Sequence, residues 1–259
     1  SLAFTRDGAR LVSAASGHIK LWRLDGGARV WEIRNFPTIR GMALTPDDLS
    51  LIAVNGTSIK VWQLADQALA QTITLEGFLP ITHLALGPDG RLAVVSTDFS
   101  LELWRLEDAT LLHTLKTGRI KIQAIAFSPD GARVAIGRSN GDAEVFDVQT
   151  GESVLSVPHE EVNDLAFSPD GALLATAGTD SDIRLWQVTD GELAQTLTGH
   201  SYNVLALAFS PDGRTLASAS REGVKLWSLP EGELRETLFN VEIVHDLAFS
   251  PDGALLAVP

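Results

Sequence analysis

A seven-residue stretch, Leu-Ala-Phe-Ser-Pro-Asp-Gly at 165–171, recurs along the whole chain and limits what the chain can fold into. Near-copies occupy residues 2–8, 42–48, 84–90, 125–131, 207–213 and 247–253. The proline position, held by Arg6 in the first copy, returns every 40 to 42 residues. A fixed period of this length indicates a repeat architecture, in which each period is one supersecondary unit.

Each period is predicted to contain four short antiparallel strands. Residues 165–167 form a short apolar run that ends at a turn, as expected of a buried strand. In Ser-Pro-Asp-Gly the proline fixes φ near the value that a turn requires, and glycine ends the turn. Further strands are predicted at 173–177, 183–188 and 192–197, and no period contains a ten-residue helical pattern.

The third predicted strand carries an aromatic residue in six of the periods. It ends in Leu-Trp, Val-Trp or Val-Phe, at Trp22, Trp62, Trp104, Phe146, Trp186 and Trp227. A Gly-His pair opens one period at Gly199-His200, and Pro158-His159 is a related pair. The chain thereby resembles the WD-repeat β-propeller family, with the regular repeats common in bacterial members. Another propeller family shares the Ser-Pro-Asp-Gly turns but lacks the recurrent Leu-Trp strand, so the WD-repeat interpretation is preferred.

The resemblance implies an all-β fold, a β-propeller of four-stranded antiparallel blades. We expect residues 1–259 to form a single propeller domain with blades at about 1–35, 36–76, 77–117, 118–158, 159–198 and 199–240, and a partial blade at 241–259. The last two strands predict a seven-bladed ring whose final blade is incomplete. An exposed strand edge favours pairing, so residues beyond this chain or a partner chain are expected to supply the missing outer strands.

Composition excludes several classes of function. The net charge of −13 argues against a nucleic-acid backbone as the main partner, because that contact requires clustered Lys and Arg. The chain has no cysteine and therefore no disulfide framework or thiolate chemistry. The absence of cysteine also fits a cytoplasmic location. No apolar run approaches the roughly 20 residues of a membrane helix, so no membrane partner is expected. The chain opens inside a predicted strand, so a further segment is expected upstream.

The family resemblance implies a buried hydrogen-bonded set of histidine, hydroxyl, acid and tryptophan in a blade. The matching residues are His159, Thr176, Asp180 and Trp186 in the fifth period and His200, Ser218 and Trp227 in the sixth. In the sixth period Glu222 stands where an Asp is expected. A hydrolase triad is the alternative. The structural interpretation is favoured because the set repeats and lacks a Gly-x-Ser-x-Gly nucleophile turn.

The loops at the mouth of the ring are the predicted binding face, because the family usually binds peptides or proteins there. Aromatic and arginine side chains are the common hot spots of such faces. The candidates for partner binding are Phe36, Arg40, Phe78, Phe99, Arg119, Lys121, Arg138 and Tyr202. Basic residues fall in blades two to four, and Glu160, Glu161, Glu222 and Glu242 in blades five to seven. The alternative is that these are ordinary solvated loop charges.

No sequence motif for a metal, a phosphate-binding loop or a dinucleotide is found, so no cofactor and no enzymatic activity are expected. The favoured function is a non-catalytic interaction scaffold or sensor that binds a peptide or protein on its loop face. We expect it to belong to a larger signalling or defence protein. Two alternatives stay open: a repeat fragment, excised or engineered, whose significance is folding or assembly, and an enzyme with a site in the central channel.

Overall fold

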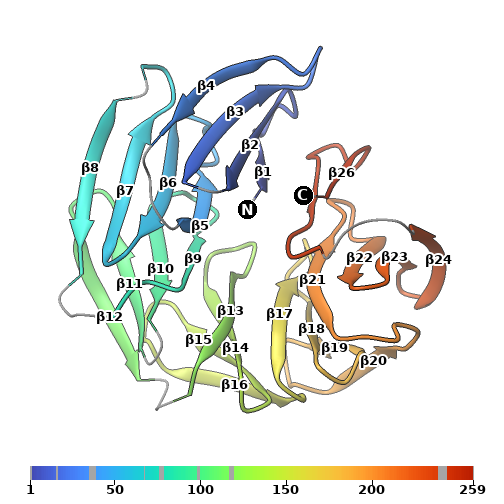
Figure 1. The fold of residues 1–259 in the computed structure, drawn as a ribbon. Coiled ribbons are helices and arrows are strands. Elements are labelled where there is room, and N and C mark those ends of the chain that lie inside the picture. The colour runs from blue at the N-terminus through green and yellow to red at the C-terminus, as the bar shows by residue number, and fades with distance from the viewer. Residues whose placement is uncertain are drawn as a thin grey trace. The chain divides into compact units, whose positions relative to one another are not determined.

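The computed structural model describes residues 2–15, 17–34, 39–66, 68–75, 79–97, 100–116, 120–238 and 244–258. In these ranges every regular element is a β-strand (Figure 1). The chain divides into two compact units, Ser1–Arg119 and Ile120–Pro259, and each unit is described by itself. The sheets are called blades 1 to 7 in chain order.

The first unit contains three four-stranded antiparallel sheets, and in each the strands follow one another in chain order. Blade 1 comprises β1 (Leu2–Phe4), β2 (Arg10–Ala15), β3 (His18–Arg23) and β4 (Arg29–Ile33). Blade 2 comprises β5 (Ile39–Leu44), β6 (Ser50–Asn55), β7 (Ser58–Gln63) and β8 (Leu69–Thr74). Blade 3 comprises β9 (His83–Leu86), β10 (Leu92–Ser96), β11 (Ser100–Arg105) and β12 (Thr110–Lys116).

The second unit repeats this arrangement three times and adds a smaller sheet. Blade 4 comprises β13 (Ile122–Phe127), β14 (Arg133–Arg138), β15 (Asp142–Asp147) and β16 (Ser153–Pro158). Blade 5 comprises β17 (Val162–Phe167), β18 (Leu173–Gly178), β19 (Ile183–Gln187) and β20 (Leu193–Leu197). Blade 6 comprises β21 (Val204–Phe209), β22 (Thr215–Ser220), β23 (Gly223–Ser228) and β24 (Glu233–Leu238), and blade 7 has only β25 (Ala248–Phe249) and β26 (Leu256–Ala257).

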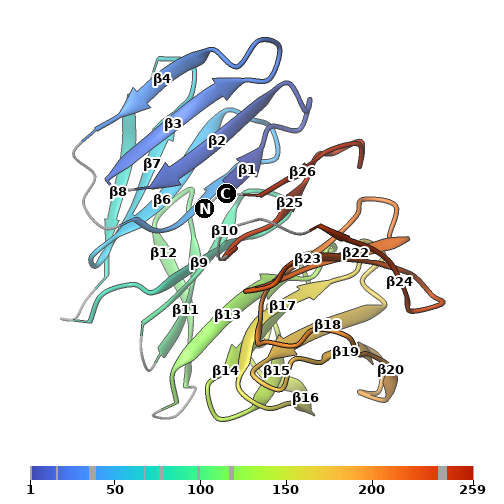
Figure 2. The same ribbon diagram turned by 45° about the vertical axis from the view of Figure 1, so that its right-hand side comes forward.

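The all-β architecture of four-stranded antiparallel blades is therefore confirmed. In both ribbon views the four strands of each complete blade lie side by side (Figure 2). The described residues contain six complete blades and a two-stranded sheet, so a seven-bladed ring is not confirmed. The predicted blade boundaries and the single-domain organisation stay predictions.

The turn that follows the first strand of a blade is held by its own serine and aspartate. In blade 5, Ser168 Oγ donates to Asp170 Oδ1 at 2.5 Å and accepts from Leu173 N at 2.9 Å. Asp170 Oδ1 also accepts from Ala172 N at 3.0 Å. Gly171 has a φ of 70°, in the left-handed region that glycine adopts without strain. These bonds explain why Ser, Asp and Gly recur together with the proline.

The core lies between neighbouring blades rather than within one. Trp186 of blade 5 packs with Val145 and Val157 of blade 4, and all three are at most 5% exposed. Trp62 of blade 2 packs in the same way against Leu21 of blade 1. Each sheet therefore needs a neighbour to bury its apolar face, as in other repeat proteins.

The Ser-Pro-Asp-Gly turns of neighbouring blades also contact one another. A Cβ placed on Gly171 would lie 3.7 Å from Pro129 Cδ of the preceding blade, and one on Gly213 would lie 3.6 Å from Pro169 Cδ. Between blades 1 and 2, Arg6 and Asp48 occupy the proline and glycine positions instead. There the Arg6 backbone N–H, which a proline would lack, donates to Asp48 Oδ2 at 2.8 Å.

Candidate functional site

The loop ends of blades 5 and 6 rest on two buried sets of hydrogen bonds. In blade 5, Trp186 Nε1 donates to Thr176 Oγ1 at 2.9 Å, and His159 Nδ1 lies 2.7 Å from the same oxygen. His159 Nε2 lies 3.1 Å from Asp180 Oδ1. Since a carboxylate only accepts, Nε2 of the neutral ring carries the proton and Nδ1 accepts the Thr176 hydroxyl. The chain of donors thus runs from the indole to the carboxylate.

Blade 6 builds the same set with a glutamate and a reversed imidazole. Trp227 Nε1 donates to Ser218 Oγ at 2.8 Å, and His200 Nε2 lies 2.7 Å from that oxygen. His200 Nδ1 lies 2.9 Å from Glu222 Oε1. The longer Glu222 side chain therefore takes the place that Asp180 holds in blade 5. In His200, Nε2 lies beside the hydroxyl and Nδ1 beside the acid, which is the reverse of the arrangement at His159.

Both imidazoles are fully buried, which governs their protonation. The side chains of His159 and His200 have no exposed surface. Burial lowers the pKa of each ring, against the raising effect of its acidic neighbour, so both rings are neutral at pH 7. Burial alone would raise the pKa of Glu222, but hydrogen bonds from Ser201 N, Lys225 and His200 lower it to about 2.

The hydroxyl groups of these sets are not available to a substrate. Thr176 and Ser218 are both 0% exposed, and each oxygen is already bonded to an indole and an imidazole. A nucleophile must reach the reacting atom. The arrangement stabilises the blades by satisfying a buried indole N–H, and it cannot serve as a hydrolase triad in this conformation.

Tyr202 is held at the surface directly beside the blade 6 set. Ser201 N donates to Glu222 Oε1 at 3.0 Å, which ties the loop to the buried His200 and to Lys225 Nζ, 3.2 Å from the same oxygen. One residue further on, Tyr202 is 52% exposed. The structure therefore exposes an aromatic ring on a loop whose backbone is held by the bond from Ser201 N to Glu222.

The other predicted binding residues are distributed unevenly. Arg40 on β5 and Lys121 before β13 are exposed. Arg138 on β14 is instead paired with Glu144, and its side chain is only 14% exposed. Its guanidinium is therefore largely committed within blade 4. Four candidates lie outside the described residues: Phe36, Phe78, Phe99 and Arg119.

The predicted acidic side of the face is also partly engaged. Glu161 accepts from Gln123 Nε2 of blade 4 at 3.1 Å, and Glu222 belongs to the buried set. Glu160 is exposed, and Glu242 lies outside the described residues. Of the acidic residues named from the sequence, Glu160 is the described one whose side chain faces solvent most openly.

Asp164 on β17 is a structural residue that the sequence did not single out. Its Oδ2 accepts from Leu207 N of blade 6 at 2.7 Å, and its Oδ1 accepts from Leu165 N at 2.8 Å. Burial raises the pKa of Asp164 to about 7, with a further raising effect from Asp246, against the lowering effect of the two N–H donors. The signal in the sequence is an Asp directly before the Leu-Ala-Phe run, at both 164 and 246.

Searches for a metal site and for a membrane-spanning helix give the following results. In the part of the chain that the structure describes, no group of three or more His, Cys, Asp or Glu side chains could hold a metal ion. The same part has no helix long and apolar enough to span a membrane.

Comparison with protein families matches three parts of the chain, residues 1–23, 151–187 and 191–228, to the WD domain, G-beta repeat. Residues 92–161 match the anaphase-promoting complex subunit 4 WD40 domain. The matched segments include the Leu-Trp strands of blades 1, 3, 5 and 6.

Curated relatives match about one quarter of the chain. Small ribosomal subunit protein RACK1 of Medicago sativa is 46% identical over 61 residues, which is 23% of this chain and 19% of that protein. The U3 small nucleolar RNA-associated protein 21 of Saccharomyces cerevisiae is 36% identical over 25% of this chain and 7% of its own length. An uncharacterised WD repeat-containing protein of Synechocystis sp. is 38% identical over 23% of this chain and 18% of that protein. The chain thus matches less than one fifth of the length of each of these relatives.

Its repeats, its four-stranded blades and these matches together show that the chain belongs to the WD-repeat β-propeller family.

Proposed function

We propose that this chain is a non-catalytic interaction module that binds a peptide or protein segment on the loop ends of blades 4 to 6, around Tyr202. The observation that carries the proposal is the exposed Tyr202 ring on a loop fixed by Ser201 N and Glu222. An aromatic side chain held in place before binding loses little conformational freedom in a complex. Exposed Lys121 and Glu160 on the neighbouring loops supply charges of both signs.

The family supports this function at a coarse level, because WD-repeat propellers are typically protein-interaction scaffolds. Two of the similar proteins carry names of ribosomal and small nucleolar RNA-associated proteins, which describe those proteins alone. Membership of a larger signalling or defence protein and a cytoplasmic location are parts of the proposal.

The test selects binding peptides from a displayed random library against the folded chain and then measures the Kd of each peptide by calorimetry. We expect Tyr202→Ala to weaken binding by about tenfold or more, since interface tyrosines are often hot spots. Tyr202→Phe, which keeps the ring, should retain most of the affinity.

Val154→Ala is the matched control, because Val154 is 53% exposed on β16 of the same unit but belongs to an outer strand. Thermal unfolding verifies that each variant is folded. Peptides that bind Tyr202→Ala as tightly as the wild type would refute the proposed face.

A further inference from the structure

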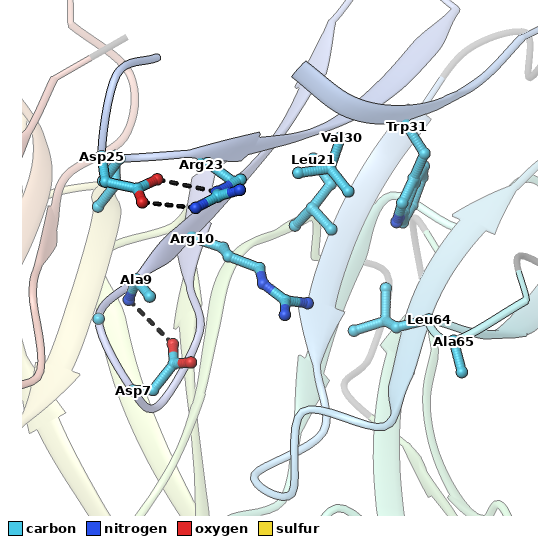
Figure 3. A pocket seen from close by; sticks show the side chains of 12 residues that line it. Asp7, Ala9, Arg10, Leu21, Arg23, Asp25, Val30, Trp31, Leu64 and Ala65 are labelled. Atoms are coloured by element: carbon cyan, nitrogen blue, oxygen red, sulfur yellow. Dashed lines mark hydrogen bonds and ion pairs between the residues drawn. The ribbon is translucent and has the colours of Figure 1, made fainter. Parts of the chain in front are cut away.

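Inside the first unit, an open groove of about 800 Å³ lies between blades 1 and 2. It lies at the Asp7–Gly8 turn and the end of β3, and residues of β4 and the segment after β7 complete it (Figure 3). The residues that line it include Arg10, Leu21, Arg23, Val30, Trp31 and Leu64. A volume of this size is in the range of small-molecule and peptide side-chain sites.

Arg10 projects its guanidinium into this groove without a hydrogen-bond acceptor among the described residues (Figure 3). It stands directly opposite Arg23 in the β2–β3 register, and like charges in that position repel. Arg23 is neutralised by Asp25, with bonds of 2.9 and 2.5 Å. The nearby Asp7 attracts Arg10 electrostatically but forms no hydrogen bond with it, and its Oδ1 accepts from Thr5 Oγ1 and Ala9 N. Arg10 is therefore the cation of the groove that lacks a bonded partner.

In blade 4 the arginine at the matching position has both an opposite charge beside it and a hydrogen-bond acceptor. Arg133 begins β14 as Arg10 begins β2, but it stands opposite Asp147 in the register. Its Nη1 donates to Val188 O of the next blade at 3.3 Å. Arg10 thus lacks both features that Arg133 has, namely an acidic residue opposite it in the register and a carbonyl acceptor on the next blade.

Trp31 supplies a second donor without a partner. Its side chain is only 6% exposed, and its Nε1 is buried with no hydrogen-bond acceptor among the described residues. Figure 3 shows the nitrogen edge of the ring turned toward Leu64, across the groove from β3. In blade 5 the residue at this register position is Gln195, whose Nε2 donates to Glu231 O of blade 6 at 3.1 Å. A buried unpaired donor is destabilising, and an acceptor from outside the chain would offset that cost.

We propose that this groove binds a carboxylate joined to a branched apolar group, the chemistry of a leucine-like chain end or of a free N-acyl amino acid. The planar carboxylate matches the fork of Arg10 in two parallel hydrogen bonds. The apolar group packs on Val30, which is 45% exposed, beside the edge of Leu64, which is 9% exposed. An oxygen of the ligand also accepts from the Trp31 N–H.

A single negative charge fits the groove better than a phosphate dianion. Asp7 and Asp25 lie among the lining residues, and the chain carries a net charge of −13. Because Asp25 is neutralised by Arg23, a second charge on the ligand would add repulsion mainly from Asp7, with only one unpaired guanidinium to offset it.

The test titrates N-acetyl-leucine into the chain by calorimetry, with N-acetyl-leucinamide as the neutral probe of the same shape. We expect saturable binding of the carboxylate and at least about tenfold weaker binding of the amide. Arg10→Leu should weaken the binding of N-acetyl-leucine by a similar factor. The variant should still fold, because Leu173 begins the equivalent strand of blade 5. Arg10→Lys keeps the charge without the fork and should fall between the two.

Arg235→Leu is the matched control, since it removes one exposed arginine from β24 of the other unit. Three outcomes would overturn the proposal: no binding up to about 10 mM, equal binding of both probes, or undiminished binding to folded Arg10→Leu.

Acetyl-Gly-Gly-Leu with a free carboxylate then separates the two sources. Tighter binding than N-acetyl-leucine supports the site with a peptide terminus as its ligand, and weaker binding supports it with a free acyl amino acid. This inference does not depend on Tyr202. A failure here leaves the proposed function standing, and a failure of the Tyr202 experiment leaves this groove untouched.

Discussion

Asp164 shows how one side chain joins two blades at the cost of a buried charge. Its two oxygens hold the backbone N–H groups of Leu165 and Leu207, so the bond to Leu207 ties β17 to β21. The same burial raises the pKa of the carboxyl to about 7. Above that pH the folded chain must keep an ionised carboxylate in a poorly solvated place, whereas the unfolded chain ionises Asp freely near pH 4.

Stability should therefore fall with rising pH at this residue. The contribution of Asp164 is fully present below about pH 4 and is lost as the pH rises through about 7. Asp164→Asn removes the titration. We expect the difference in free energy of unfolding, wild type minus variant, to decrease by up to about 4 kcal/mol between pH 4 and 8. Urea unfolding of both proteins across this range measures it, and parallel pH profiles would contradict the assignment.

At this scale the sequence predicts residues whose partners recur at a fixed spacing. The histidine, hydroxyl, acid and tryptophan of blade 5 could be named because every member lies inside one period, from His159 to Trp186. The pairing of Arg138 with Glu144 could not be predicted, because Glu144 stands on the next strand and nothing in the spacing marks the pair. Asp164 bonds to backbone in another blade, and backbone donors have no sequence signature.

At the scale of elements, the contact between successive turns determines how neighbouring blades fit. In the blades with the full motif, the glycine of one turn faces the proline of the turn before it, as Gly213 faces Pro169. Arg6 and Asp48 replace this steric fit with a hydrogen bond of 2.8 Å. Asp48 keeps the left-handed backbone of the glycine, with a φ of 56°, which aspartate tolerates better than most residues.

The two residues should therefore be coupled in stability. Arg6→Pro alone removes the donor of a charge-assisted bond and should destabilise the chain by about 1–2 kcal/mol. Asp48→Gly alone loses the same bond but relieves the left-handed strain. The double variant restores the usual pair and should be more stable than the sum of the single effects by about 1 kcal/mol. A double-mutant cycle by urea unfolding measures this term, and strict additivity would show that the two positions are independent.

The strands themselves were predictable because each period contains its own turn and strand motifs. The Ser-Pro-Asp-Gly turn and the Leu-Trp strand place the first three strands of a blade. β18 and β19 match the predicted ranges to within one residue, whereas β17 begins three residues earlier than predicted, at Val162. The first copy, with Arg6 for proline, looks merely degenerate in the sequence. Its compensation by Asp48 lies 42 residues away and becomes visible only when the turns are seen in contact.

At the scale of the molecule, the last sheet differs from the others in having only β25 and β26. Ala248 pairs with Ala257 and Phe249 with Leu256, and no further strand is bonded to β26 among the described residues. Leu256 is partly exposed, whereas Leu174 at the matching place on β18 is 0% exposed. The apolar face is thus less completely covered here than in the complete blades.

Hydrogen exchange should register this difference. Amides of residues 248–257 are expected to exchange faster than those of β17 and β18, because local opening breaks fewer bonds and exposes less apolar surface. Exchange followed by mass spectrometry on the intact chain measures both segments in one experiment. Equal protection of the two segments would mean that the two-stranded sheet is as stable as a complete blade.

The exchange of Pro and Gly for Arg and Asp between blades 1 and 2 has a consequence for how such a gene can change. Duplication or loss of a repeat between blades 4 and 6 again joins a proline turn to a glycine turn, because those blades carry the same pair. Recombination that separates blade 1 from blade 2 instead brings Arg6 against a glycine, or Asp48 against a proline without an N–H to donate. The repeats of blades 4 to 6 can therefore replace one another at this contact, whereas blades 1 and 2 should be inherited together.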